Sequence, residues 1–169
     1  GAAAAAERLG LPSDRIHLAP VGCEHWVRDA PARRRRHDPP SLLVLGALRG
    51  GRRHDRILDA FERLVSRGRE ARLFFVGRDG DAAADLAPRI AARADVQWLR
   101  APRERDMPEL VSSATLLVHL SAEELTAVTP LEACALGPAV VASRLPAFEE
   151  ALFPLSFYVD DAAERVPAS

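Results

Sequence analysis

The sequence predicts an α/β fold, a three-layer α/β/α domain built on a mainly parallel sheet of about six strands. Short, continuous apolar runs alternate along the chain with stretches whose apolar residues recur at helical spacing. Apolar runs without polar alternation are typical of strands that are buried on both faces. A repeated order of strand, helix and strand gives right-handed crossovers, which place helices on both faces of the sheet.

The strands are expected at the apolar runs. The first run, 16–19, lies in a segment, 14–22, that we expect to add a strand to the domain. The remaining predicted strands are residues 42–45, 73–76, 96–99, 116–120, 139–142 and 157–159. Their spacing along the chain is that of repeated strand and helix units.

The intervals between these strands carry helical patterns. Residues 56–65 place apolar side chains at helical intervals, and Gly68 follows them as a stop signal. Residues 81–94 are rich in alanine, but Pro88 should kink or split the helix that they form. A shorter helix is expected at 106–113.

The last predicted helix, 130–136, has both start and stop signals. Gly137 closes it, and the stretch from Thr129 to Glu132 is a capping-box pattern with Pro130 at the first helical position. In this interpretation Glu132 has a structural role as a cap.

The chain divides into a leading segment, 1–40, and a compact domain, 41–169. The leading segment is expected to hold a helix, the first strand and a linker rich in arginine and proline at 28–40. The four arginines at 33–36 have no apolar period around them, which favours a solvated linker. The alternative is a contact with anionic lipid or with an acidic partner.

Composition excludes several classes of protein. The 169 residues carry 23 basic and 24 acidic side chains, and this balance predicts no nucleic-acid partner. Cys23 and Cys134 stand far apart and are interpreted as packing residues, so neither a disulfide nor a zinc site is expected. No apolar stretch approaches the ~18 residues that span a bilayer, and the alanine run at 2–6 is too short for a signal peptide. These features predict a cytoplasmic protein.

Ligands of open parallel sheets bind beyond the carboxyl ends of the strands, so the loops there are the candidate sites. The loop 46–53 begins with Gly46 and carries Arg49, Arg52 and Arg53 just before a helix. Backbone amides, the positive end of a helix and arginine side chains together favour a phosphate or diphosphate. The spacing is neither that of a Walker loop nor that of a dinucleotide loop, and a flexible surface loop is the alternative.

Two further loops follow predicted strands. Gly77 and Arg78 begin a glycine-containing loop after 73–76, for which a plain turn is the simplest interpretation. Glu124 and Glu132 are separated by seven residues after the strand 116–120, and their carboxylates could accept hydrogen bonds from sugar or ribose hydroxyls. The alternatives are a solvated acidic loop for Glu124 and a helix cap for Glu132, and we interpret His119 as a packed core residue.

Taken in order, these features resemble the C-terminal, donor-binding domain of family 4 retaining glycosyltransferases, also called group 1, whose GT-B fold has two facing Rossmann-like domains. The resemblance runs from about residue 16 to residue 161. It is carried by Pro20-Val21-Gly22, Gly46-Ala47-Leu48 with Arg52, 57–61, 73–77, Val96, Trp98, Leu110, Ala114, Ser121, Glu124, Pro130-Leu131-Glu132-Ala133, Gly137, 140–143 and 146–150.

The resemblance implies roles for individual residues. Glu132 would bind the ribose hydroxyls of a UDP- or GDP-sugar, and Glu124 would be the catalytic residue beside the transferred sugar. Arg52 would replace the family's diphosphate-binding lysine, with a planar fork suited to phosphate. The resemblance also implies transfer with retention and without a metal ion or other cofactor. The other implied donor-binding residues are Gly46, Arg49, Arg53, Gly77, Arg78, Leu125, Thr126, Ala127 and Val128.

The family's acceptor is bound by an N-terminal domain, which we expect to be absent from this chain. The chain alone is therefore predicted to bind a donor without turning it over. The whole protein would act on a polysaccharide or glycolipid at the cytoplasmic face of a membrane, with a peripheral membrane association.

Some residues depart from the family's pattern. Ala47 stands in place of a diphosphate-binding arginine, Arg100 in place of a glycine near the base, and 125–127 in place of Gly-Phe-Gly. Side chains at glycine positions limit how closely the backbone can approach a ligand. These departures keep open the alternative of a degenerate GT-B half that serves as a binding or assembly module. A non-hydrolysing sugar-nucleotide epimerase, which shares the fold, is a further and weaker alternative.

Overall fold

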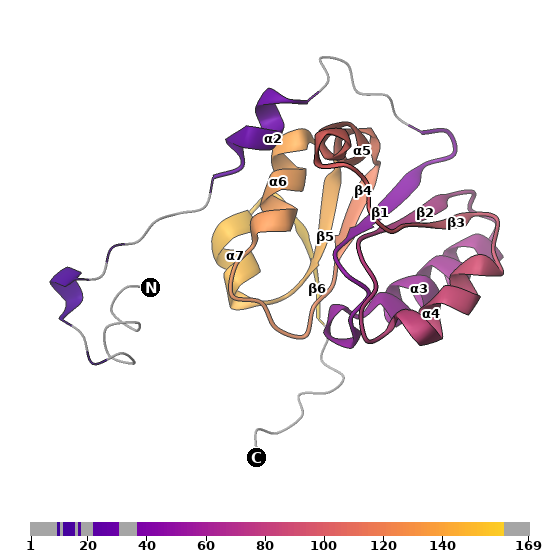
Figure 1. Cartoon of the computed structure of the whole chain (residues 1–169), viewed down its shortest axis with the longest axis horizontal. Coiled ribbons are helices and arrows are strands. Elements are labelled where there is room, and N and C mark those ends of the chain that lie inside the picture. Colours follow the sequence, from indigo (N-terminus) through magenta and orange to yellow (C-terminus); the bar gives the residue numbers. More distant parts are fainter. Residues whose placement is uncertain (1–9, 11, 16, 18–21, 31–36, 161–169) are drawn as a thin grey trace.

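A computed structural model describes residues 10, 12–15, 17, 22–30 and 37–160. In this part of the chain the strands form one six-stranded, parallel sheet in the order β3-β2-β1-β4-β5-β6 (Figure 1). The bounds of the strands are β1 Ser41–Leu45, β2 Arg72–Val76, β3 Val96–Leu99, β4 Leu116–His119, β5 Ala139–Ser143 and β6 Phe157–Val159. The predicted parallel α/β fold is confirmed.

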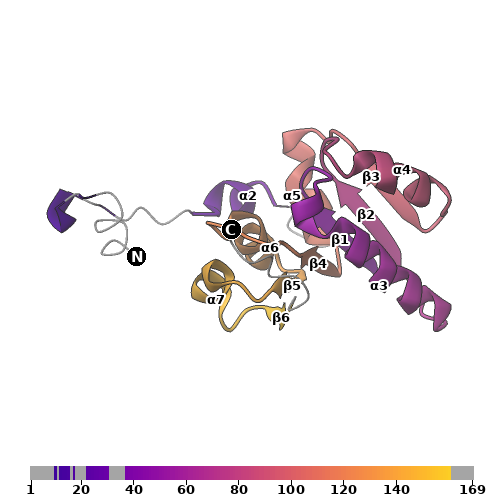
Figure 2. The same cartoon turned by 90° about the horizontal axis from the view of Figure 1, so that it is seen from below.

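Helices cover both faces of this sheet, as Figures 1 and 2 show. Helices α3 (His54–Ser66) and α4 (Ala83–Ala91) cover one face, and α2 (Glu24–Arg28), α5 (Met107–Ser113), α6 (Val128–Leu136) and α7 (Pro146–Leu152) cover the other. Three short 3-10 turns complete the described elements: η1 Ser13–Arg15, η2 Gly50–Arg52 and η3 Glu104–Asp106.

Each face of the sheet has its own hydrophobic core. In β1, Leu43 and Leu45 pack in the cluster under α2, α5, α6 and α7, whereas Val44 packs in the cluster under α3 and α4. Successive side chains of a strand point to opposite faces, so a strand covered on both sides must be apolar at every position. This is why the strands read as unbroken apolar runs in the sequence.

Helix α4 differs from its prediction. The pattern at 81–94 forms a single helix, Ala83–Ala91, and the exposed Pro88 lies inside it without splitting it. Leu86 and Ile90 flank Pro88 and are both buried against the sheet. The packing of these two side chains thus offsets the loss of the one backbone hydrogen bond that the proline cannot donate.

The predicted capping box of α6 is wrong. The helix begins at Val128, and its N-cap residue, Ala127, makes no side-chain capping bond. Thr129 and Pro130 are therefore the second and third helical residues. Proline fits there because the amide groups of the first turn have no partner within a helix in any case. Glu132 is consequently free of the capping role.

Two predictions for the leading segment lie largely outside the described residues: the helix near the start and the strand at 16–19, of which only residue 17 is described. The arginines at 33–36 also lie outside them. Helix α2 was not predicted from the sequence; it is a short helix whose Trp26 is buried against α6 and α5. Within the described residues, no helix is both long and apolar enough to cross a lipid bilayer.

Candidate functional site

The carboxyl ends of β1, β2 and β4 meet at one edge of the sheet, which we call the carboxyl edge. It is formed by the loops 46–53, 77–82 and 120–127. The first two loops are joined by backbone hydrogen bonds: the amide of Leu48 donates to the carbonyl of Arg78 over 3.1 Å, and the amide of Ala82 donates to the carbonyl of Leu48 over 3.0 Å. The two glycine-containing loops therefore form one unit.

Glycine is required where these loops touch. Gly77 has a φ of +151°, and a Cβ atom there would collide with the carbonyl oxygen of Gly46. A Cβ atom on Gly80 would likewise collide with the carbonyl oxygen of Leu48. The loop after β2 thus supports the loop after β1, which is a more specific role than the plain turn expected from the sequence.

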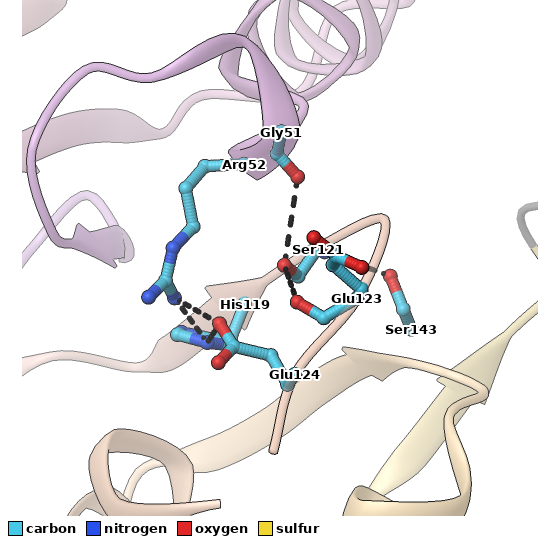
Figure 3. A network of polar contacts seen from close by, with 7 residues as sticks. All are labelled: Gly51, Arg52, His119, Ser121, Glu123, Glu124 and Ser143. Atoms are coloured by element: carbon cyan, nitrogen blue, oxygen red, sulfur yellow. Dashed lines mark hydrogen bonds and ion pairs between the residues drawn. The ribbon is translucent and has the colours of Figure 1, made fainter. Parts of the chain in front are cut away.

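Arg52 ends the short turn η2 and extends toward the loop that follows β4 (Figure 3). Its Nη1 atom lies 2.7 Å from Oε1 of Glu124 and 2.7 Å from Nε2 of His119. Nε2 of His119 is in turn 3.5 Å from Oε1 of Glu124. The structure therefore brings Arg52 and Glu124 together and adds His119, whose polar contact the sequence analysis missed.

His119 is buried at the end of β4, and its side chain is only 4% exposed. Its ring meets that of Phe148 edge-on, with centroids 5.4 Å apart. A guanidinium group can only donate hydrogen bonds, so Nε2 must be the acceptor, and the proton of the neutral ring is on Nδ1. Burial, and then the positive charge of Arg52, lower the pKa of His119 to about 3. The ring is therefore neutral at physiological pH.

Hydrogen bonds hold the loop of Glu124 in place, and Figure 3 shows those that Ser121 makes with Gly51, Glu123 and Ser143. The amide of Ala122 donates to the carbonyl of Gly51 over 2.8 Å, and the amide of Ser121 donates to Oγ of Ser143 over 3.0 Å. Oε1 of Glu124 is buried and, among the described residues, accepts no well-aligned hydrogen bond despite its ion pair with Arg52. The ion pair with Arg52 is therefore the contact that holds this carboxylate oxygen.

Glu132 lies in α6 with a side chain that is 9% exposed, and Nε2 of His25 in α2 is 3.3 Å from its Oε1. Burial raises the pKa of Glu132, whereas His25 lowers it and the carboxylate of Glu104 raises it. Glu104 also accepts a hydrogen bond from Nε1 of Trp26 over 3.2 Å. No sequence pattern marked His25 as a partner of Glu132, because the two residues come from elements far apart in the chain.

The other predicted donor-binding residues are arranged around these groups. Arg49 and Arg78 are exposed, Gly46 and Arg53 are half-buried, and Arg53 has a left-handed backbone with a φ of 52°. Leu125 is 96% exposed. Thr126 is also exposed, whereas Ala127 is buried and Val128 begins α6.

Arg100, one of the departures noted in the sequence, packs beside this edge. Its guanidinium lies 4.2 Å from the centroid of the Trp98 ring and 3.7 Å from Asp79. Nε1 of Trp98 donates to the carbonyl of Gly77 over 2.8 Å. Within the described residues, no three His, Cys, Asp or Glu side chains are grouped so that they could hold a metal ion.

Residues 28–156 match the family model described as glycosyl transferases group 1. No curated protein matches the chain significantly. Among solved structures, TarM superposes with a TM-score of 0.68 at 14% identity, covering 79% of this chain and 27% of that chain. WaaG, a glycosyltransferase involved in lipopolysaccharide biosynthesis, superposes with a TM-score of 0.56 at 24% identity, covering 79% of this chain and 35% of that chain.

A glycosyltransferase from Rickettsia africae ESF-5 superposes with a TM-score of 0.68 at 18% identity, covering 92% of this chain and 45% of that chain. The chain thus spans less than half the length of each of these three proteins. At such low identities the similarity to the solved structures shows the fold alone. The family is shown by the sequence model, which matches most of the chain. The chain belongs to the group 1 glycosyl transferases and has the Rossmann-like fold of one half of a GT-B glycosyltransferase.

Proposed function

We propose that this chain is the donor-binding half of a retaining glycosyltransferase, which transfers a sugar from a nucleoside diphosphate sugar to a polysaccharide or glycolipid. The observation that carries the proposal is the meeting of Arg52 and Glu124 at the carboxyl edge, where Nη1 and Oε1 are 2.7 Å apart. A cation and a carboxylate from different loops lie where ligands of parallel α/β sheets bind.

In this proposal Arg52 binds the diphosphate of the donor. Negative charge grows on the diphosphate as the glycosidic bond breaks, and a fixed cation stabilises it. A phosphate oxygen would compete with Glu124 for the guanidinium. The carboxylate of Glu124 would then face the transferred sugar, whose hydroxyls are donors that a carboxylate accepts well.

Glu132 would accept hydrogen bonds from the ribose hydroxyls of the nucleotide. Its burial supports this role, because a buried carboxylate needs donors to offset the loss of hydration. His25 supplies one such contact, at Oε1, and a ribose hydroxyl would add another. We propose no metal ion and no other cofactor for the reaction.

The acceptor would be held by a second domain, as in the two-domain GT-B architecture. WaaG is involved in lipopolysaccharide biosynthesis, and this supports a glycolipid or polysaccharide acceptor for the present protein. The whole protein would then work at the cytoplasmic face of a membrane with a peripheral association.

Calorimetric titration with UDP, GDP and their sugars tests the donor site. We expect one of the two nucleotides to bind and Arg52→Gln to weaken its affinity by about tenfold or more, since hydrogen bonds to charged groups contribute ~1.5–3 kcal/mol. Arg63→Gln, which changes an exposed arginine on α3, is the matched control and should leave the affinity unchanged. The absence of binding by any of these nucleotides at millimolar concentration would refute the proposal.

The alternative is a GT-B half that serves as a non-catalytic binding or assembly module. One observation favours it: Arg52 and Glu132 already have partners within the chain, Glu124 and His25. A ligand must displace or share these contacts, which weakens binding. Against it, Leu125 is 96% exposed and so is not packed among the candidate site residues. The titration decides between the two functions, because the module would bind none of the nucleotides.

A further inference from the structure

We propose that His119 is a positioning residue for Arg52, and that its neutral Nε2 atom holds the guanidinium at the carboxyl edge ready for a diphosphate. This inference rests on the proposed function of the chain as a donor-binding domain. It goes beyond the interpretation of His119 as a core residue, because Nε2 of the ring is proposed to orient the Arg52 guanidinium.

The position of His119 is fixed from two sides. It ends β4, where it is in register with Ala142 of the neighbouring strand β5, and its ring meets that of Phe148 in α7. Glu124, the other partner of Arg52, belongs instead to the loop between β4 and α6. His119 is thus a strand residue, whereas Glu124 is a loop residue. A strand of a sheet fixes the position of a side chain more accurately than a loop does.

The two partners also differ in charge. Glu124 is a carboxylate that competes directly with phosphate oxygens for the guanidinium. His119 accepts a hydrogen bond without neutralising the cation, so its contact does not reduce the charge that a phosphate meets when it displaces Glu124. Both contacts use Nη1, which leaves Nε and Nη2 unused by them. Those donors can form the paired hydrogen bonds that an arginine makes with phosphate.

The surroundings keep His119 in the required state. Burial of the ring, and then the positive charge of Arg52, hold the pKa of His119 far below neutrality. A protonated ring would have no acceptor atom and would repel the guanidinium. The arrangement therefore selects the neutral ring that the positioning role needs.

The test compares the wild-type chain with His119→Phe and His119→Gln at pH 7.5. Phenylalanine keeps the aromatic packing but has no acceptor, whereas the amide oxygen of glutamine can reach the position of Nε2. Calorimetry with UDP, inorganic pyrophosphate and uridine measures the affinities. We expect His119→Phe to weaken the affinities for UDP and for pyrophosphate by about tenfold or more. The affinity for uridine should stay unchanged. His119→Gln should restore most of the loss.

An equal affinity of His119→Phe and the wild type for UDP and pyrophosphate would overturn the role of His119 and leave the proposed function standing. Equal losses for uridine would also overturn it, because they would indicate a general distortion of the domain.

If the wild type binds none of UDP, GDP and inorganic pyrophosphate, the proposed function fails, and nitrogen-15 NMR then tests the contact between His119 and Arg52 directly. A proton on Nδ1, together with slow rotation of the Arg52 guanidinium in the wild type and fast rotation in His119→Phe, supports the positioning contact. A proton on Nε2, or equal rotation in both proteins, overturns it.

Discussion

Arg52 and Glu132 are two charged candidate site residues that differ in their exposure to solvent. Arg52 has a side chain that is 31% exposed, and its guanidinium contacts both a neutral acceptor and a carboxylate. Glu132 is nearly buried, and its burial raises the cost of ionisation. Each side chain therefore responds differently to substitution and to pH, and both responses can be measured without a ligand.

Replacing Glu132 should change how stability depends on pH. Burial raises the pKa of Glu132 above its ordinary value of 4.5, so the native state binds this proton more tightly than the unfolded state does. The free energy of unfolding of the wild type then falls as the pH rises above that value. We expect the free energy of unfolding of Glu132→Gln not to fall in this way. The variant should therefore become more stable relative to the wild type as the pH rises from 4 to 7.

Urea unfolding at several pH values measures this difference. The same comparison in a His25→Gln background removes the charge of the histidine that lies 3.3 Å from Glu132. Parallel pH profiles of the wild type and Glu132→Gln in both backgrounds would contradict the prediction.

Gly77 is the residue at which a single methyl group should have a large effect. Gly77→Ala places a Cβ atom against the carbonyl of Gly46 at a φ of +151°. We expect a loss of about 2 kcal/mol or more in the free energy of unfolding, as measured by urea denaturation. Gly51→Ala is the control, since a Cβ atom there meets nothing within 4 Å, and it should cost about 0.5 kcal/mol or less. Similar losses in the two variants would contradict the prediction.

The strands within 41–159 were predicted well, because burial on both faces leaves an unbroken apolar run in the sequence. The helix boundaries were predicted less well, since local signals compete with packing. Pro88 signalled a break in α4, but the burial of Leu86 and Ile90 keeps that helix whole. Pro130 signalled the first helical residue of α6, although a proline fits equally well at the third.

Helix α2 depends on a tertiary contact. It has five residues, too few for a stable isolated helix, and Trp26 anchors it through burial and a hydrogen bond to Glu104. We expect Trp26→Ala to speed amide hydrogen exchange in Glu24–Arg28 by about tenfold or more, with little change in the central strands β1 and β4. Val27→Ala, at a position that is 47% exposed, is the matched control. Unchanged exchange in α2 would show that other contacts hold it.

On the scale of the whole molecule, the order of the strands explains which parts of the site could be predicted. The sequence indicated Glu124, Glu132 and the arginine-containing loop, because each follows a strand. It could not indicate that Nη1 of Arg52 meets the ring of His119, since that contact depends on β1 and β4 being neighbours in the sheet. Nor could it pair His25 with Glu132, because no periodicity connects α2 to α6.

The chain alone should bind a donor without transferring its sugar. In the proposed function the described residues serve the donor, and a second domain would bring the acceptor to the same edge. We therefore expect no sugar transfer to a glycan acceptor above the uncatalysed background, in an assay that follows release of the free nucleoside diphosphate. Transfer by the purified chain would contradict this expectation and would place the acceptor site within the 169 residues.

The pairing of β1 with β4 also suggests a use for the domain. A cut in the connection between β3 and α5 would leave Arg52 on one fragment and His119 and Glu124 on the other. In the proposed function, each fragment would then carry only part of the contacts to the nucleotide sugar. Binding of that small molecule would then favour complementation of the two fragments, and the split domain would serve as a sensor for it.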